Sequence, residues 1–242
     1  MRYKCKCSYD GTLFHGFQIQ KKMRTVQSEI ESTLLLVLKQ KIRIYPAGRT
    51  DTGVHAIGQV FHFDSSIEIE ASKMKKAINS RLPKDIFISD VEITDNEFHA
   101  RFSAKSKEYH YICDFGEYNP LYCNYRFYCR YRNIDFNIFE KAIHLYVGSH
   151  DFRYFSRSKK ISDTVREIYS ISCCKDGALV TVKIIGNGFL HNMIRIMIAS
   201  AFEVARGKIR LCEIEKALAG VAPLQAPKKL PASGLYLINI DY

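Results

Sequence analysis

The chain opens with RYKCKCSYDGTLFHGFQIQKKMRTVQSEIESTLLLVLKQ, residues 2–40. Residues 2–9 alternate between apolar and charged side chains, which is the pattern of a strand with one buried face. Thr25 is a favourable helix N-cap residue, and after it apolar residues recur at helical spacing, at Val26, Ile30, Leu34 and Leu38. The stretch therefore predicts a strand followed by a helix that ends at about Gln40.

The rest of the chain is predicted to repeat these kinds of element. The first half continues with an extended segment, a strand, a basic helix and a strand, at residues 42–47, 60–63, 71–81 and 86–93. The second half begins with a strand at 109–113 and a helix at 136–147. A hairpin around Asp176-Gly177 follows, with strands at 167–174 and 179–185. The half ends with helices at 189–206 and 211–219 and a strand at 235–240. The first half thus follows the order β-α-β-β-α-β, and the second half repeats it with one additional short helix before its last strand. This is the split βαβ order of ferredoxin-like domains.

This order predicts an α+β fold with two ferredoxin-like halves, residues 1–104 and 105–242, that share one extended antiparallel or mixed sheet. Antiparallel sheets with helices on one face leave the other face free to join another sheet or to bind a ligand. No low-complexity linker separates the halves. We therefore expect them to form one structural unit with a continuous core.

The composition is that of a globular protein with an excess of positive charge. Hydrophobic residues make up 47% and charged residues 25% of the 242 residues, which argues against disorder and against a fibrous protein. Lys and Arg number 36 against 25 Asp and Glu, so the formal net charge is +11. This excess favours a polyanionic partner, and nucleic acid is a better candidate than an acidic membrane surface.

The eight cysteines do not have the spacing of a zinc site, because none forms a Cys-x-x-Cys pair. A disulfide framework is not expected in a chain of this length without a secretory signal. The N-terminus lacks the apolar run of a signal peptide. The most apolar segment, Met193 to Ala205, is interrupted by Arg195 and Glu203 and is too short to span a bilayer. We expect a cytoplasmic protein with no metal site and no membrane contact.

The first candidate site is the segment Gly48-Arg49-Thr50-Asp51-Thr52-Gly53-Val54-His55. One interpretation is a simple turn, because Gly, Asp and Thr are common turn formers and Arg49 can pair with Asp51. The segment is longer than a tight hairpin requires, however, and runs on to Gly58. A longer loop with a carboxylate between cations is a good place to display a reactive group. Both interpretations remain open on this pattern alone.

The second candidate begins at Gly186-Asn187-Gly188 and continues into an apolar helix predicted from Phe189. It is not a dinucleotide-binding loop, because His191 stands where that motif requires Gly or Ala. Arg195 follows His191 by four residues, which would place both on one helix face. A buried Arg needs an anionic partner, and Asp51 is our choice. The alternative is that Arg195 extends along its aliphatic stem to the surface.

The third candidate combines His99-Ala100-Arg101-Phe102-Ser103-Ala104 with Tyr109 and Tyr111, which share a strand face. Aromatic residues on a strand are usually part of the core, but a Tyr beside cations can also stack on a base. Two further segments, from Tyr122 to Arg132 and from Phe152 to Lys160, interleave aromatic and basic residues. Each can contact a phosphate backbone, although solvated basic loops are common.

Taken together, these motifs resemble the tRNA pseudouridine synthase A family over nearly the whole chain. The Arg49-Thr50-Asp51 block and the Phe98–Ala104 block are the most specific of them, because they occur together and in order. The other matching motifs are Tyr9-Asp10-Gly11, Thr25-Val26-Gln27, Gly58-Gln59-Val60, Asn79-Ser80-Arg81-Leu82-Pro83, Tyr109-His110-Tyr111, His150-Asp151-Phe152, Asn187–Arg195 and Gly234-Leu235-Tyr236-Leu237.

The resemblance implies a role for several residues. Asp51 matches the catalytic aspartate of the family, Tyr109 the tyrosine that stacks on the target base, and Arg195 the arginine that pairs with that aspartate. Arg49 matches the basic residue that helps to hold the nucleotide flipped out. Within the matching motifs, the expected substrate-binding residues are Arg49, Tyr109, Arg101 and His55.

The resemblance also implies an isomerase that converts uridine to pseudouridine at positions 38, 39 and 40 of the tRNA anticodon stem-loop. It implies a homodimer with no metal or organic cofactor and an active cleft between the two halves. The uridine must leave the stack before its glycosidic bond can be reached. Asp51 then acts either as a nucleophile at the sugar or as a base that removes a sugar proton; the residues do not distinguish these roles.

Two positions depart from the family pattern, in a region expected to contact RNA. Phe17 stands where a Trp is common, and Ile19, between Gln18 and Gln20, stands where an Arg is often found.

Two other functions also fit parts of the sequence. One is a pseudouridine synthase for other sites in tRNA or ribosomal RNA, which would share every catalytic residue. The other is a non-catalytic protein that binds or remodels RNA, although such a protein has no need for Asp51.

Overall fold

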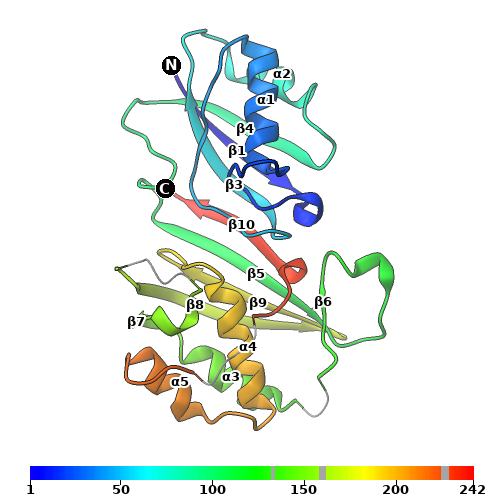
Figure 1. Cartoon of the computed structure of the whole chain (residues 1–242), viewed down its shortest axis with the longest axis vertical. Helices are drawn as coiled ribbons and strands as arrows, with labels where there is room; N and C mark the ends of the chain where they lie inside the picture. Colours follow the sequence, from blue (N-terminus) through cyan, green and yellow to red (C-terminus); the bar gives the residue numbers. More distant parts are fainter. Residues whose placement is uncertain (132–133, 158–161, 225–228) are drawn as a thin grey trace. The chain divides into compact units, whose positions relative to one another are not determined.

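The structure is a computed structural model that describes residues 1–131, 134–157, 162–224 and 229–242. The chain divides into two compact units, one formed by Met1–Lys107 with Tyr236–Tyr242 and the other by Glu108–Leu235. Both units combine strands and helices (Figure 1), so the predicted α+β class is confirmed. The last strand is grouped with the first unit, whereas the ranges predicted for the halves leave it in the second.

The first unit is built around β1 (Arg2–Tyr9), which pairs antiparallel with a strand on each side. The strand order is β4-β1-β3-β10, and β10 runs parallel to β3. The other strands are β2 (Tyr45–Pro46), β3 (His55–Asp64), β4 (Ile86–Thr94) and β10 (Leu235–Asp241). Figure 1 shows the two helices of this unit next to each other on one side of the sheet, α1 (Val26–Leu38) and α2 (Ala71–Asn79).

The alternation in β1 has the predicted consequence, because every second side chain is buried: Tyr3, Cys5, Cys7 and Tyr9. Helix α1 begins as predicted after Thr25, whose Oγ1 accepts the Ser28 N–H at 3.2 Å while Ser28 Oγ accepts the Thr25 N–H at 3.1 Å. The helix ends at Leu38, slightly before the predicted Gln40, because Lys39 adopts a left-handed conformation with φ of 55°.

The second unit has the strand order β5-β9-β8-β7. Its strands are β5 (Ser106–Asp114), β6 (Phe127–Tyr128), β7 (Gly148–Asp151), β8 (Val165–Asp176) and β9 (Leu179–Gly186). Its helices are α3 (Phe136–His144), α4 (Met193–Ala205) and α5 (Leu211–Leu218). The predicted hairpin is confirmed: Asp176 pairs with Leu179, and Gly177 supplies the positive φ of 56° that the turn requires.

Helix α4 forms the centre of the core of the second unit, and all of its residues except Glu203 are buried. It packs on α3, where the rings of Phe139 and Phe202 stack at a centroid distance of 4.5 Å. The prediction that this helix begins at Phe189 is wrong. It begins at Met193, because Asn192 has a positive φ of 63° that a helix cannot include.

Short elements with no strong periodicity were not predicted from the sequence. They are the strands β6 and β7 and the 3₁₀ helices η1 (Gly11–Leu13), η2 (Pro120–Tyr122), η3 (Arg153–Phe155) and η4 (Ala232–Gly234).

In the described ranges no helix has the length and apolarity to cross a membrane. All cysteines are free thiols, and burial raises the pKa of those at Cys5, Cys7 and Cys113, which makes them poor nucleophiles.

His62 in β3 is a buried titratable group, with an exposed fraction of 2%. Its Nδ1 accepts the Ala100 N–H at 3.1 Å, and its ring stacks on Tyr45 at 5.2 Å. Burial, followed by the neighbouring charge of His99, lowers the pKa of His62 from 6.5 to about 4. Between these pH values the unfolded chain binds a proton that the folded protein does not bind. Stability therefore falls as pH decreases through this window, by at most about 3 kcal/mol.

Replacing His62 with Asn should remove this part of the pH dependence, because Asn can still accept the Ala100 N–H but does not titrate. The measurement is denaturant unfolding of both proteins at several pH values from about 7 down to about 4. The variant starts less stable because it loses the stacked ring, so the slope with pH is the relevant quantity. Two curves that run parallel over this window would contradict the role of His62.

Candidate active site

The loop that carries Asp51 joins β2 to β3 and is held by backbone groups at several points. Phe17 N–H donates to the carbonyl oxygen of Thr50 at 3.1 Å, and Val54 N–H donates to that of Asp51 at 3.1 Å. Gly53, with φ of 77°, allows the chain to reverse before β3. The loop is thus a defined turn, as the simpler interpretation of the sequence proposed, and it presents Asp51 in a fixed backbone conformation.

A buried polar network lies under the loop. The phenol oxygen of Tyr9 is 2.8 Å from Oγ1 of Thr50, and both residues are buried. The fully buried Gln59 donates from Nε2 to the carbonyl oxygen of Gly48 at 2.9 Å, and the same nitrogen lies 3.5 Å from the Tyr9 phenol. Residues on β1 and β3 therefore determine where the loop begins and how the residue before Asp51 is oriented.

Two glycines allow neighbouring backbone to approach this loop. A Cβ atom on Gly16 would lie 2.8 Å from the carbonyl oxygen of Thr50 and 3.3 Å from the carbonyl carbon of Asp51. A Cβ atom on Gly11 would lie 2.1 Å from the carbonyl oxygen of Val54. The distances of 2.8 and 2.1 Å are shorter than real Cβ contacts, so any other residue at these positions would displace the loop.

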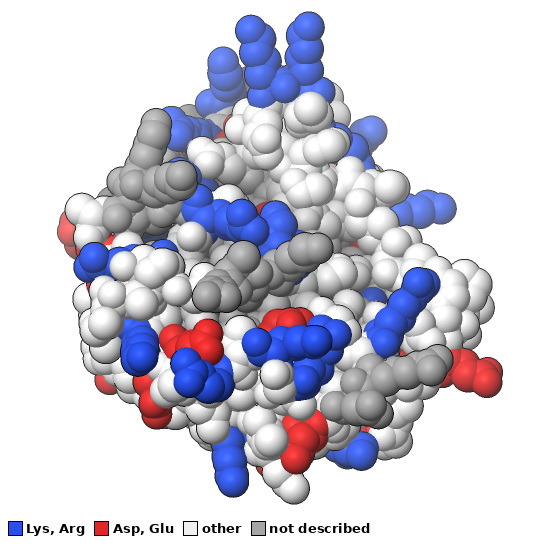
Figure 2. Space-filling model, turned by 60° about the horizontal axis from the view of Figure 1, so that its bottom comes forward, with Lys and Arg blue, Asp and Glu red and all other residues white. Residues whose placement is uncertain are grey.

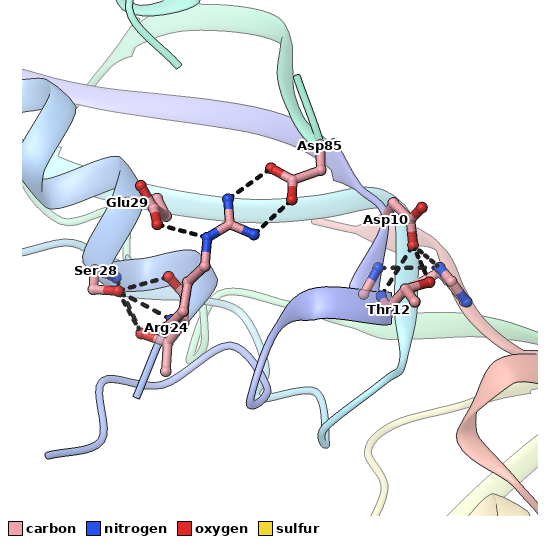
Figure 3. Close-up of polar contacts among 9 residues, drawn as sticks. Asp10, Thr12, Arg24, Ser28, Glu29 and Asp85 are labelled. Carbon is pink, nitrogen blue, oxygen red and sulfur yellow. Dashed lines mark hydrogen bonds and ion pairs between the residues drawn. The ribbon is translucent and has the colours of Figure 1, made fainter. Parts of the chain in front are cut away.

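The segment that contains Gly16 leads to Arg24, which Asp85 and Glu29 hold in place (Figure 3). The guanidinium group of Arg24 donates two hydrogen bonds to the carboxylate of Asp85, at 2.7 and 3.0 Å, and one to Glu29 at 2.8 Å. It also lies over the ring of Phe14, 4.2 Å from the centroid. These contacts restrain the chain at Phe14 and at Arg24, on the two sides of Gly16.

The predicted site residues of the first unit differ in their environments. Asp51 is half-buried, whereas Arg49 and Arg101 are exposed. His55 has an exposed fraction of 2%; its Nδ1 accepts the Gly11 N–H at 3.1 Å and lies 3.2 Å from the Asp10 carboxylate. The His55 ring also stacks on Tyr236 at 4.8 Å. His55 therefore holds the turn that follows β1, in the interior of the unit.

The second unit contains Tyr109 and Arg195. Tyr109 is buried on β5 and contacts Phe189 edge to face at 5.1 Å. Arg195 has an exposed fraction of 7%, so its side chain does not extend to the surface. Its Nε donates to the carbonyl oxygen of Leu230 at 2.7 Å, and its Nη1 donates to Oδ1 of Asn192 at 3.0 Å. The pairing of Arg195 with Asp51 stays a prediction, as do the roles of all these residues.

Asn192 is a candidate site residue that the sequence interpretation missed. It orients Arg195 through Oδ1, while its Nδ2 is buried and has no acceptor among the residues that the structure describes. An unsatisfied buried donor in a residue with a strained backbone often marks a functional site. In the sequence Asn192 falls inside the predicted helix, and the only available signal is that Asn tolerates the left-handed conformation. His191 also precedes the helix, so the prediction that it shares a helix face with Arg195 is wrong.

The two segments that interleave basic and aromatic residues are described only in part, because Arg132 and residues 158–160 lie outside the described ranges. Within the first segment, Arg126 lies over the ring of Tyr122 at 4.1 Å, but it also pairs with Asp114 at 3.4 Å. Figure 2 shows that, on the face drawn there, acidic side chains lie among many of the basic ones. The excess charge of the chain does not by itself identify a binding surface.

Comparison with known proteins identifies the family of this chain and the reaction of that family. A family model described as tRNA pseudouridine synthase matches residues 7–103 and 142–242. A protein of Geobacillus sp. (strain WCH70) named tRNA pseudouridine synthase A is 43% identical over 244 residues, covering 100% of this chain and 98% of that protein. A protein of the same name from Bacillus subtilis (strain 168) is 41% identical, covering 100% of this chain and 99% of that protein.

These matches extend over both units and include the loop of Asp51 and the segment around Arg195. The resemblance found in the sequence motifs is therefore confirmed at the level of the family. The chain belongs to the tRNA pseudouridine synthase family, and it is an isomerase that converts uridine in tRNA to pseudouridine.

Proposed function

We propose that this enzyme modifies uridines at positions 38, 39 and 40 of the tRNA anticodon stem-loop. The observation that carries the proposal is the identity of 41% to 43%, over the full chain, to proteins named tRNA pseudouridine synthase A. The motif resemblance assigns these three positions to that family. The excess of basic residues fits a substrate with a phosphate backbone.

Asp51 is the proposed catalytic carboxylate. Isomerisation breaks the bond between the uracil N1 and the sugar, rotates the base and forms a bond from the sugar to C5. A carboxylate assists the first step either by attacking the sugar or by removing a sugar proton. Both routes need Asp51 at a defined distance from the sugar, and the hydrogen bonds of Thr50 and Gly48 support such positioning.

Two residues of the second unit are proposed to act on the same uridine. Arg195 pairs with Asp51 and orients it, and its own orientation is set by Leu230 and Asn192. Tyr109 stacks on the uracil and assists the loss of the C5 proton. Neither role needs a metal ion or an organic cofactor.

Substrate contacts complete the proposal. The exposed side chains of Arg49 and Arg101 bind the RNA, and Arg49 helps to hold the uridine out of the stack. His55 contributes from the interior, through the turn of Asp10 and Gly11 that it contacts. We also propose a cytoplasmic homodimer, as in the family that the motifs resemble. Light scattering of the purified protein measures its oligomeric state directly.

Replacing Asp51 with Asn should abolish pseudouridine formation but leave tRNA affinity largely intact, because Asn keeps the size of the side chain and cannot act as nucleophile or base. The measurement is tritium release from tRNA labelled at C5 of uridine. Asp90→Asn, at an exposed carboxylate on β4, is the matched control and should keep full activity.

The same assay tests the target positions if each tRNA transcript keeps uridine at only one of positions 38, 39 and 40. All three transcripts should release tritium. Release only from transcripts with uridine elsewhere would replace this proposal with a synthase for other sites. Substantial activity of the Asp51→Asn enzyme would overturn the assignment of Asp51 alone.

Replacing Arg195 with Met should lower kcat sharply, because the buried guanidinium group that orients the carboxylate is lost. Arg195→Lys should restore activity only in part, since Lys supplies charge without the planar fork that reaches both Leu230 and Asn192. Arg206→Met, just after α4 at a residue paired with Glu203, controls for a general loss of helix stability. Steady-state kinetics on tRNA give the comparison. Equal kcat values for Arg195→Met and Arg206→Met would show that Arg195 has only a structural role.

Tyr9→Phe should lower kcat about ten-fold while leaving KM for tRNA nearly unchanged, because it removes the hydrogen bond to Thr50 that orients the loop. Tyr3→Phe is a matched control on the same strand, since the Tyr3 phenol bonds to the backbone of Ile69, away from the loop. Both variants should lose about 1 kcal/mol of stability. If the two substitutions change kcat equally, the effect on Tyr9 is one of stability and the positioning role is wrong.

A further inference from the structure

The first unit carries a continuous row of cationic and aromatic side chains outside the Asp51 loop. We call it the Phe102 surface, and it consists of Arg43, Tyr45, His99, Arg101 and Phe102. Arg43 lies over the Tyr45 ring at 5.5 Å, Tyr45 is 6.1 Å from His99, His99 is 4.4 Å from Phe102, and Arg101 lies over the Phe102 ring at 5.7 Å. Two segments far apart in the sequence thus form one surface.

Phe102 has an exposed fraction of 77%, and the turn that presents it is held in place. Nδ1 of His99 accepts the N–H groups of Arg101 at 3.1 Å and Phe102 at 3.3 Å. Ser103 N–H donates to the carbonyl oxygen of His99 at 2.8 Å, and His99 N–H donates to Oγ of Ser103 at 3.0 Å. The exposed ring is therefore a feature of a rigid turn, with its hydrogen bonds formed inside the turn itself.

The two arginines of this surface differ from the arginines that hold the fold together. Among the described residues, neither Arg43 nor Arg101 forms an ion pair, whereas Arg2, Arg24, Arg126 and Arg153 each contact a carboxylate. Guanidinium groups over exposed rings, without a carboxylate, favour an anionic ligand that also has a flat apolar face. A second copy of the chain is a poorer occupant, because symmetric pairing would bring these cations together.

We propose that the Phe102 surface binds a stretch of the tRNA away from the reacting uridine, with an unpaired base stacked on Phe102 and the adjoining phosphates against Arg43 and Arg101. The inference rests on the tRNA substrate of the proposed function and not on which uridines react. Unpaired bases are the ones whose faces are free for an aromatic side chain. The contact increases affinity for the whole tRNA and takes no part in the chemistry.

The test is the Kd for tRNA that wild-type enzyme has already modified to completion, so that binding is measured without turnover. Phe102→Ala should weaken binding roughly ten-fold, within the range for loss of one stacked base, and Phe102→Trp should restore it. Arg43→Gln and Arg101→Gln should each reduce the slope of log Kd against log salt by about 0.7 to 0.9. Phe87→Ala on β4, with an exposed fraction of 53%, is the matched control and should bind as wild type does.

Three results would overturn the inference: an unchanged Kd for Phe102→Ala, an equal loss in Phe87→Ala, or a lower molar mass of Phe102→Ala by light scattering, which would make the surface an interface between copies. A change in melting temperature identifies a variant that is simply misfolded. If Phe102→Ala is misfolded, Phe102→Trp is compared with Phe102→Leu, and the Trp variant must bind tRNA more tightly because only it keeps an aromatic face. The proposed function fails separately, since pseudouridine at other positions leaves these affinities unchanged.

Discussion

The hydrogen bond from Phe17 N–H to the carbonyl oxygen of Thr50, 3.1 Å long, joins the segment after η1 to the loop of Asp51. It forms only because Gly16 has no Cβ, which would lie 2.8 Å from that same carbonyl oxygen. The segment is in turn restrained by Arg24 and its two carboxylate partners. The position of Asp51 in the first unit therefore depends on a close approach between two pieces of backbone.

This constraint explains one departure from the family pattern. Phe17 is fully buried, and its ring lies 6.1 Å from that of Tyr9, so the residue packs under the loop. A Phe in place of the more common Trp is therefore a change in core packing, not in a contact with RNA. Ile19 differs, because it has an exposed fraction of 48%. The absence of an Arg there removes a positive charge from the surface.

Positive charge in this protein has two distinct uses. Several arginines hold the fold together by pairing with carboxylates, as Arg2 does with Asp64 and Arg24 with Asp85. In such pairs the charge is largely compensated and attracts little RNA. Arg43 and Arg101 instead lie over exposed rings, where their charge remains available to a ligand. The net charge of +11 indicates a polyanionic partner, but the pairing of individual side chains decides where it can bind.

The sequence by itself determined the elements whose signals are local: β1 from its alternation, α1 from its cap at Thr25, and the β8–β9 hairpin from Gly177. It also determined the family, because the order of the motifs is specific. Only the tertiary structure decided that α4 begins after Asn192. Asn192 has a left-handed backbone conformation that local propensity does not predict, and its side chain accepts a hydrogen bond from Arg195. The tertiary structure alone also decided that His55 is interior and Phe102 exposed. Burial depends on contacts between segments far apart in the chain, and residue type indicates only what such contacts would favour.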